Sequence, residues 1–178
     1  MTSQQCLQIL RTVKDVAFAS VDAQGDPQVR IIDAMLIEEE RLYFCTARGK
    51  DFYQQLIAHP RIAIVGMNKD FQMVRLSGEA RHLDDQKYWI DRIFAENPSM
   101  YDVYPGDSRY ILEAFCIDTG ELCFFDLGRS PIEQEQLPLG DGTPSLNGFA
   151  IQDAHCLHCG LCRERCPMQA IKKRGENR

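Results

Sequence analysis

Apolar and polar residues alternate through much of the first 126 residues, and this period of two predicts short β-strands. The strands are expected at residues 16–21, 28–37, 42–46, 61–67, 72–81, 110–118 and 121–125. Other stretches place apolar residues three and four apart, which predicts helices over residues 2–13, 50–58 and 84–97. The turn residues Thr119 and Gly120 predict a hairpin between the last two strands.

Most of the connections between these strands are too short for a parallel crossover, so the sheet is expected to be antiparallel. A small closed or partly closed barrel would remove the edges of such a sheet. The pattern changes after Asp126, because residues 127–146 are rich in proline and glycine and resemble a linker. The sequence therefore predicts a barrel domain at 1–126, a linker at 127–146 and a second small unit at 147–178.

The chain is 44% apolar and carries a net charge of −6. This apolar share supports a folded core, and the acidic balance predicts no nucleic-acid partner. No apolar run approaches the roughly 20 residues of a membrane span, so no membrane association is expected. Met1–Ser20 lacks the uninterrupted apolar core of a signal peptide, and we therefore expect a cytoplasmic protein.

Cysteines gather near the end of the chain in the run C-x2-C-x2-C-x3-C-P, formed by Cys156, Cys159, Cys162 and Cys166 and followed by Pro167. This spacing is typical of a bacterial 4Fe–4S ferredoxin. Two-residue spacers let one tight loop wrap a compact cluster, and Gly160 permits a left-handed backbone inside it. The residues around the run, 149–151 and 168–171, resemble one half of a two-cluster ferredoxin, which implies a ferredoxin-like iron–sulfur segment.

Two questions about these cysteines stay open on the sequence. A structural zinc site is the alternative occupant, although zinc sites usually use two ligand pairs separated by a longer loop. In two-cluster ferredoxins the fourth cysteine of each run serves the other cluster, so Cys166 could complete its own cluster or that of a second subunit. Four further cysteines lie in apolar segments and are expected to be core thiols. These are Cys6, Cys45, Cys116 and Cys123.

The first 115 residues or so also resemble the pyridoxamine 5′-phosphate oxidase-like family of split-barrel flavoproteins. The resemblance is carried by Gly25-Asp-Pro-Gln-Val-Arg30, by Leu42-Tyr-Phe-Cys-Thr-Ala-Arg-Gly-Lys50, by Gln55-Leu56 with His59-Pro-Arg-Ile62, and by Val74-Arg-Leu-Ser-Gly-Glu-Ala80. It implies a six-stranded antiparallel split β-barrel, a homodimer, and FMN in the cleft between the subunits.

The resemblance also implies site residues. It places Arg30, Thr46 and Lys50 around the FMN phosphate, and Gln72 against the flavin of the other subunit. A phosphate dianion suits a bidentate arginine, a hydroxyl donor and a lysine. Each of these side chains is also ordinary for its place on a strand end or a solvated helix. The family's Arg-rich C-terminal tail is replaced here by the linker and the cysteine run, so oxidation of pyridoxamine phosphate is not expected.

These observations together predict a flavin- and iron–sulfur-dependent oxidoreductase. FMN exchanges two electrons and a 4Fe–4S cluster carries one, so the chain would join a two-electron reaction to a one-electron partner. Ferredoxin or NAD(P)H is the redox partner expected. No nucleophile–base pair is visible, so no catalytic residue is assigned. The alternatives are a redox or ligand sensor without turnover and a haem-binding split barrel.

Overall fold

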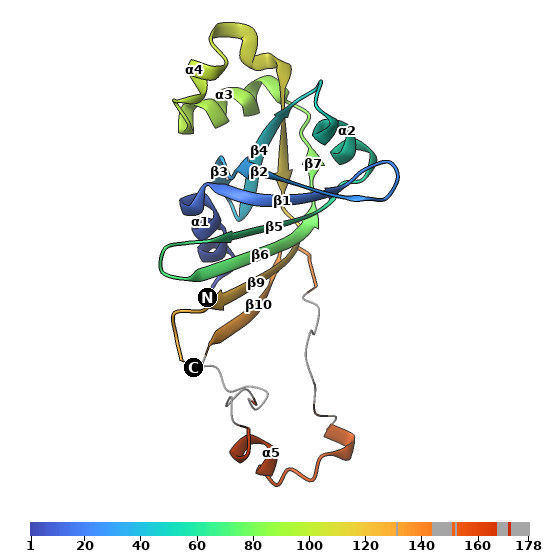
Figure 1. Ribbon diagram of the computed structural model, residues 1–178, viewed down its shortest axis with the longest axis vertical. Coiled ribbons are helices and arrows are strands. Elements are labelled where there is room, and N and C mark those ends of the chain that lie inside the picture. Colours follow the sequence, from blue (N-terminus) through green and yellow to red (C-terminus); the bar gives the residue numbers. More distant parts are fainter. Residues whose placement is uncertain (131, 144–150, 152, 167–170, 172–178) are drawn as a thin grey trace.

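The computed structural model describes residues 1–130, 132–143, 151, 153–166 and 171 (Figure 1). Its strands are β1 Asp15–Val21, β2 Pro27–Asp33, β3 Leu36–Glu38, β4 Arg41–Ala47, β5 Arg61–Met67, β6 Gln72–Glu79, β7 Arg81–His82, β8 Leu112–Ile117, β9 Gly120–Asp126 and β10 Glu133–Leu139. Its helices are α1 Ser3–Val13, α2 Asp51–Ala58, α3 Gln86–Glu96, α4 Met100–Val103 and α5 Leu161–Glu164, with 3₁₀ turns at Gly106–Ile111 and Asp153–His155.

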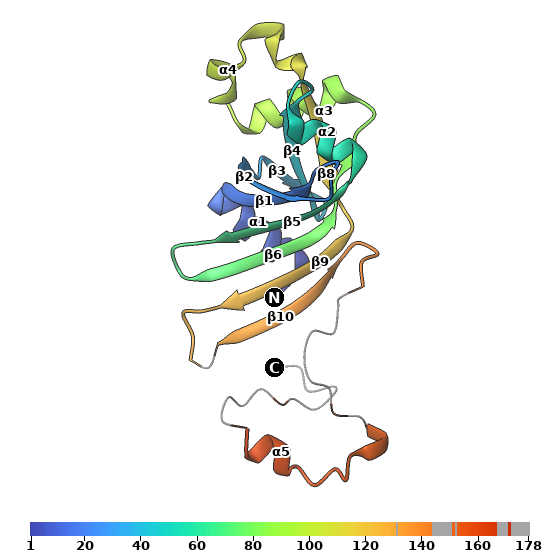
Figure 2. The ribbon, with the colours of Figure 1, turned by 45° about the vertical axis from the view of Figure 1, so that its right-hand side comes forward.

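The strands form two sheets in which all the pairings are antiparallel. One sheet has the order β10-β9-β6-β5-β1-β2 and the other has the order β3-β4-β8-β7. Figure 2 shows the six-stranded sheet as one curved layer, with α3 and α4 beyond its upper end. The prediction of a mainly β fold with antiparallel sheets is therefore confirmed, and the three long helices lie where periodicity predicts them.

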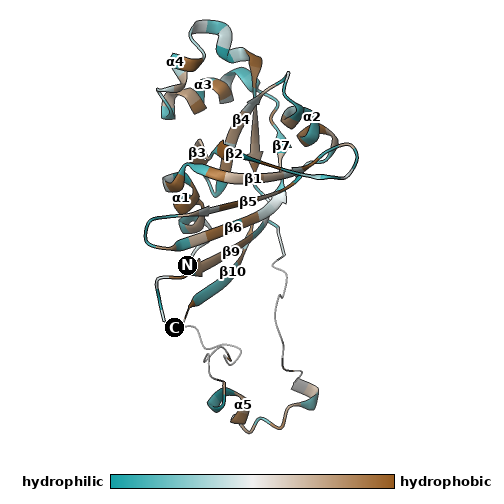
Figure 3. Ribbon diagram, viewed as in Figure 1, coloured by the Kyte–Doolittle hydropathy of each residue, from teal (hydrophilic) through white to brown (hydrophobic). Residues whose placement is uncertain are grey.

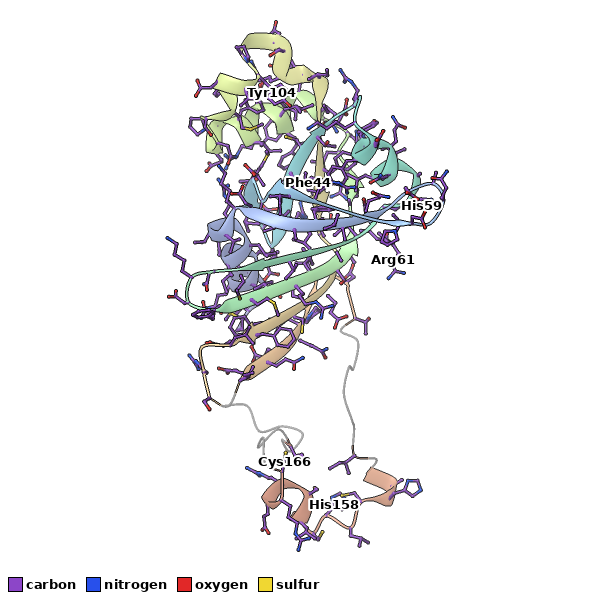
Figure 4. All side chains as sticks on the ribbon, viewed as in Figure 1. Phe44, His59, Arg61, Tyr104, His158 and Cys166 are labelled. Carbon is purple, nitrogen blue, oxygen red and sulfur yellow. The ribbon has the colours of Figure 1, made fainter. Side chains whose placement is uncertain are left out.

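The main core fills the space between the two sheets. Its centre is a set of aromatic rings in contact, with Phe18 and Phe44 centred 5.0 Å apart and Phe18 and Phe52 centred 5.1 Å apart. Figure 4 shows Phe44 in the middle of the barrel region, and Figure 3 shows brown, apolar residues along α1 where it packs on β5 and β6. Tyr43 points to the opposite face of β4, where it stacks on Trp89 of α3.

Two predicted strands, 28–37 and 72–81, are each divided between the sheets. The chain leaves the six-stranded sheet at Ala34 and at Ala80, both buried, and joins the four-stranded sheet as β3 and β7. Such corners are how strands switch between packed sheets. Burial alternates through the corner at Ala80, whereas Ala34, Met35 and Leu36 are buried in succession. Neither stretch of sequence indicates the change of partner strand.

The predicted hairpin between residues 110–118 and 121–125 is wrong. β8 pairs with β4 and β7, whereas β9 pairs with β6 and β10. Thr119 and Gly120 form a crossing between the sheets, at which a Cβ on Gly120 would lie 2.2 Å from the Ser77 carbonyl oxygen. Gly120 is therefore required by the close approach of two backbones, a use of glycine that a turn signal does not distinguish.

The linker prediction is wrong for residues 133–139, which form β10 and pair with β9 along its whole length. β10 is an edge strand, and there Pro138 is tolerated because a missing N–H can face away from the partner strand. Figure 3 shows why the pattern misled, since the first half of β10 is teal and hydrophilic. Leu139 is fully buried, so the barrel extends well past Asp126.

None of the helices in the described part of the chain is long and apolar enough to span a membrane. The cysteine segment is described from Asp153 to Cys166, with α5 between the second and last cysteines. The flanks that resemble a ferredoxin, residues 149–150 and 168–170, lie outside the described residues, and so does Pro167.

Candidate functional site

Arg30 projects from β2 toward α2 and is held by two neutral side chains. Its Nη1 donates to the Ser20 hydroxyl at 2.6 Å, and its Nη2 donates to Gln55 Oε1 at 2.8 Å. The guanidinium carbon also lies 4.3 Å from the centre of the Phe52 ring, a cation–π contact. Strands β1 and β2 and helix α2 therefore meet at this one half-buried cation.

The aromatic core fixes the helix that carries these partners. Phe52 and Leu56 are the buried residues of α2, and the Phe52 ring packs edge-on against Phe18. Aromatic pairs of this kind add about 0.5–1.5 kcal/mol beyond the area they bury. Gln55 lies beside this buried face, so the packing that attaches α2 to the barrel also sets the position of the amide next to Arg30.

Arg30 has no carboxylate partner within the described residues, whereas six other arginines of the chain do. Arginines that do form ion pairs in the described chain are Arg41, Arg48, Arg81, Arg92, Arg109 and Arg129. Burial lowers the pKa of Arg30 from its ordinary value, and no carboxylate acts in the other direction. A partly desolvated cation without a counter-ion favours an anion from outside the chain.

Thr46 and Lys50 border the same end of α2. Thr46 is two residues beyond Phe44 on β4, and although it is only 3% exposed, its hydroxyl makes no hydrogen bond within the described residues. No fully buried side-chain nitrogen or oxygen of the described chain lacks a partner, so that hydroxyl keeps contact with solvent. Thr46 lies four residues before Lys50 on the strand that precedes α2, and Arg30 contacts Phe52 in the first turn of that helix.

Lys50 is the N-cap residue of α2, and its own side chain makes no capping bond. It is exposed, so its ammonium can move toward a ligand at the helix start. The amides of a first helical turn attract anions. The carboxylate of Asp51 lies in the same turn, so anion binding here depends on Arg30 and Lys50 more than on those amides.

Gln72 does not belong to this cluster within one chain. It lies four residues along β6 from the row that holds Arg30, and three strands away, which separates the two Cα atoms by about 20 Å. Its side-chain oxygen accepts a hydrogen bond from Asn68 Nδ2 at 2.9 Å. It lines a separate cleft of about 490 Å³ between α1 and the ends of β6, β9 and β10.

The sequence analysis did not identify Glu113, a buried acidic residue beside Thr46 that forms ion pairs. Glu113 is paired directly opposite Thr46 across β4 and β8, and its side chain is only 8% exposed. One carboxylate oxygen meets Arg48, and the other lies 2.8 Å from His82 Nε2. Arg48 precedes Lys50 by two residues, so the ion pairs of Glu113 hold the loop that leads into α2. A charged residue in an otherwise apolar strand is the signal that could have found Glu113.

The sequence also gave no indication of Ser20 and Gln55, the two partners of Arg30. Ser20 is the penultimate residue of β1, in which the residues after Asp15 are otherwise alanine, valine and phenylalanine, and Gln55 is a common residue type on a helix surface. Neither residue type indicates a contact with a distant arginine. Only the fold shows that they meet.

The four clustered cysteines form no disulfide and lie in and around α5. Cys159 and Cys162 are exposed, and Cys156 and Cys166 are half-buried. His158 N donates to Cys156 Sγ at 3.4 Å, and Gly160 adopts the left-handed conformation with φ of 77° before α5. Figure 4 shows His158 and Cys166 on this segment. Within the described residues, no three cysteine, histidine or acidic side chains are gathered as a ligand set for a metal.

The comparisons with known proteins agree with the fold. A NimC/NimA family protein from Clostridium acetobutylicum is 25% identical, with a TM-score of 0.65 over 77% of this chain and 92% of that chain. A heme-binding protein from Mycobacterium smegmatis is 16% identical, with a TM-score of 0.53 over 76% of this chain and 58% of that chain. A FAD-binding protein from Mesorhizobium loti is 18% identical, with a TM-score of 0.50 over 66% of this chain and 88% of that chain.

No curated protein sequence matches the chain. The family model described as pyridoxamine 5′-phosphate oxidase matches residues 2–108. The matched range includes β1–β7 and the residues around Arg30, namely Ser20, Thr46, Lys50, Phe52 and Gln55. That match covers more than half of the chain, and the cysteine segment lies outside it. The chain therefore belongs to the pyridoxamine 5′-phosphate oxidase family.

Proposed function

We propose that this protein is an oxidoreductase that holds FMN in its barrel and a 4Fe–4S cluster on its C-terminal cysteines. The main observation that supports FMN binding is Arg30, a half-buried cation whose two hydrogen bonds go only to neutral oxygens. Membership of the family and a fold shared with a FAD-binding protein also support FMN binding.

Arg30, Thr46 and Lys50 would hold the FMN phosphate. They supply the three kinds of group that suit it: a guanidinium fork, a hydroxyl with solvent contact and a mobile ammonium. FMN, when bound, supplies two-electron chemistry. The chain's own contribution is to fix the phosphate end through Arg30, whose position the Phe52 ring and Gln55 determine.

A homodimer completes this proposal. The outer face of the six-stranded sheet carries a row of exposed apolar side chains on β2 and β5, namely Val29, Ile31, Val65 and Met67. Val29 and Ile31 are 73% and 63% exposed, which is unusual for β-branched residues in a central part of a strand. A second copy packed on this face would cover them, and Gln72 of that copy is then the candidate flavin contact.

The cluster half is supported by the spacing of Cys156, Cys159, Cys162 and Cys166 and by two features of their loop. The amide of His158 points at Cys156 Sγ, and hydrogen bonds of this type stabilise thiolates around an anionic cluster. Gly160 has the left-handed backbone that a tight wrap requires. Four thiolates are a suitable donor set for 4Fe–4S, and the loop would have to draw them together on binding.

Steady-state turnover under anaerobic conditions tests the proposed oxidoreductase. The purified protein is mixed with NAD(P)H or reduced ferredoxin and a one-electron dye, and dye reduction is followed with time. We expect turnover that is lost in a Cys159→Ser variant, which retains FMN. Reduction of bound FMN in a single turnover, without continued dye reduction, would instead indicate a sensor.

Haem binding is the second candidate, favoured by the shared fold of the heme-binding protein from Mycobacterium smegmatis. His82 is an exposed histidine of the barrel, and its Nε2 already lies 2.8 Å from the Glu113 carboxylate. An anaerobic visible spectrum separates the two candidates, because haem gives a Soret band and flavin gives two peaks at longer wavelength.

A further inference from the structure

Gln55 and Ser20 fix the direction of the Arg30 guanidinium without adding charge. A guanidinium can only donate, so the Gln55 atom 2.8 Å from Nη2 must be the amide oxygen. The same oxygen accepts from the Ser20 hydroxyl at 2.7 Å, and that hydroxyl accepts from Arg30 Nη1 at 2.6 Å. The three side chains close a ring of hydrogen bonds in which Arg30 is the one charged member.

This ring is rigid because its members come from three elements of the barrel. Ser20 lies on β1 and is 2% exposed, Arg30 lies on the neighbouring strand β2, and Gln55 lies on α2. Phe52 supports the guanidinium from the same helix. A side chain fixed by packing and by hydrogen bonds from its neighbours is the arrangement that a precise binding site requires.

A carboxylate could take the place of the Gln55 amide with almost no change of shape. Glutamate at this position would accept the same two hydrogen bonds and would form an ion pair with Arg30, as carboxylates do with Arg48, Arg81 and Arg109. It would also neutralise the only half-buried charge of the cluster. The neutral amide orients Arg30 equally well and leaves that charge for an external anion.

We propose that Gln55 is a positioning residue that makes the flavin site selective for a phosphorylated ligand. It orients Arg30 through its oxygen and, because it is neutral, leaves the charge of Arg30 for the terminal phosphate of FMN. This inference rests on the proposed function. It predicts that the identity of residue 55 controls the preference for FMN over riboflavin, which has the same ring system and no phosphate.

The test compares Gln55→Glu with Gln54→Glu, a matched variant that adds the same charge to the exposed side of the same helix. FMN, riboflavin and inorganic phosphate are titrated into each protein. Gln55→Glu should weaken FMN binding on the order of tenfold to a hundredfold, as expected for one added charge near a phosphate at moderate dielectric. Riboflavin affinity should change less than about twofold, and Gln54→Glu should resemble the wild-type protein.

Thermal unfolding without ligand is the second readout. The new ion pair should leave the midpoint of Gln55→Glu equal to or above that of the wild-type protein, so weaker FMN binding would accompany undiminished stability. Gln55→Ala, which removes the amide and adds no charge, should weaken FMN binding less than Gln55→Glu does.

The outcomes separate this inference from the proposed function. A wild-type protein that binds FMN, together with a Gln55→Glu variant that keeps its preference for FMN over riboflavin, overturns the role of Gln55 alone. Equal losses of FMN and riboflavin affinity also overturn it, because they show a structural role. A wild-type protein that binds neither FMN nor inorganic phosphate overturns both.

Discussion

The guanidinium of Arg30 lies over the ring of Phe52, with its central carbon 4.3 Å from the ring centre. This contact joins the second strand of the barrel to the first turn of α2, the helix whose N-cap residue is Lys50. Because the ring is itself packed against Phe18 in the core, the position of the charge is tied to the packing of the whole barrel.

Replacing Arg30 by alanine should weaken FMN binding by about 1–3 kcal/mol, the scale of one charge-assisted phosphate contact. Flavin fluorescence quenching measures the dissociation constant. Arg41→Ala is the control, because Arg41 begins β4 at the end away from Thr46 and is an exposed arginine paired with Glu39. Equal FMN affinity in Arg30→Ala and in the control would show that the phosphate lies elsewhere.

Lys50→Ala should also weaken FMN binding by about 1–3 kcal/mol, with little effect on unfolding, because the side chain is exposed and makes no capping bond. The loss should shrink as salt concentration rises, since an exposed charge is screened. Lys69→Ala, an exposed lysine in the turn between β5 and β6, should leave the affinity unchanged. A salt-independent loss would count against a direct charge contact.

Alkylation should divide the cysteines into two classes. Burial raises the pKa of Cys6 to about 11 and the pKa values of Cys45 and Cys116 to about 12, so in the folded protein these thiols should resist iodoacetamide at pH 8. Exposed Cys159 and Cys162 should react readily in metal-free protein. Mass spectrometry after partial labelling gives the rate at each site.

The same labelling reports on the cluster. Protein purified anaerobically with iron and sulfide should be protected at Cys156, Cys159, Cys162 and Cys166 together, and chelation of iron should remove the protection. Protection of only some of these four in the iron-loaded protein, with the rest reactive, would contradict a four-cysteine site.

Truncation tests where the barrel ends. A chain stopped after Thr143 keeps β10 and should unfold at nearly the same temperature as the full protein. A chain stopped after Asp126 loses β10, including the fully buried Leu139, and strips β9 of one partner strand. Loss of a buried leucine side chain alone costs about 2–5 kcal/mol, so this shorter chain should be much less stable or insoluble. Equal stability of the two truncated chains would show that the folded barrel ends at Asp126, as the sequence predicts.

The sequence pattern predicts an element well where the pattern depends on that element alone. Periodicity locates α1 and α3, and alternation locates β1, β5 and β9, because each buries one face against the core. It fails where pairing is decided by distant strands. The sheet changes at Ala34 and Ala80 and the polar edge strand β10 depend on partners that are far away in sequence.

In the candidate site, too, some residues can be predicted from the sequence and others are shown only by the fold. Motif order indicates Arg30, Thr46 and Lys50, and in the fold Arg30 contacts Phe52 in the first turn of α2, whose N-cap residue is Lys50. The partners of Arg30 are the neutral side chains of Ser20 and Gln55, which a single sequence does not reveal. Gln72 lies about 20 Å away within one chain, so its assignment depends on the proposed dimer.

The measurement that tests the central claim most directly is the cofactor content of protein purified without oxygen. FMN, iron, acid-labile sulfide and zinc are determined on the same sample, together with the protein concentration. The account predicts about one FMN, four iron and four sulfide per chain, with the iron and sulfide lost and the FMN retained in Cys159→Ser. One zinc per chain with no sulfide and no flavin would contradict it.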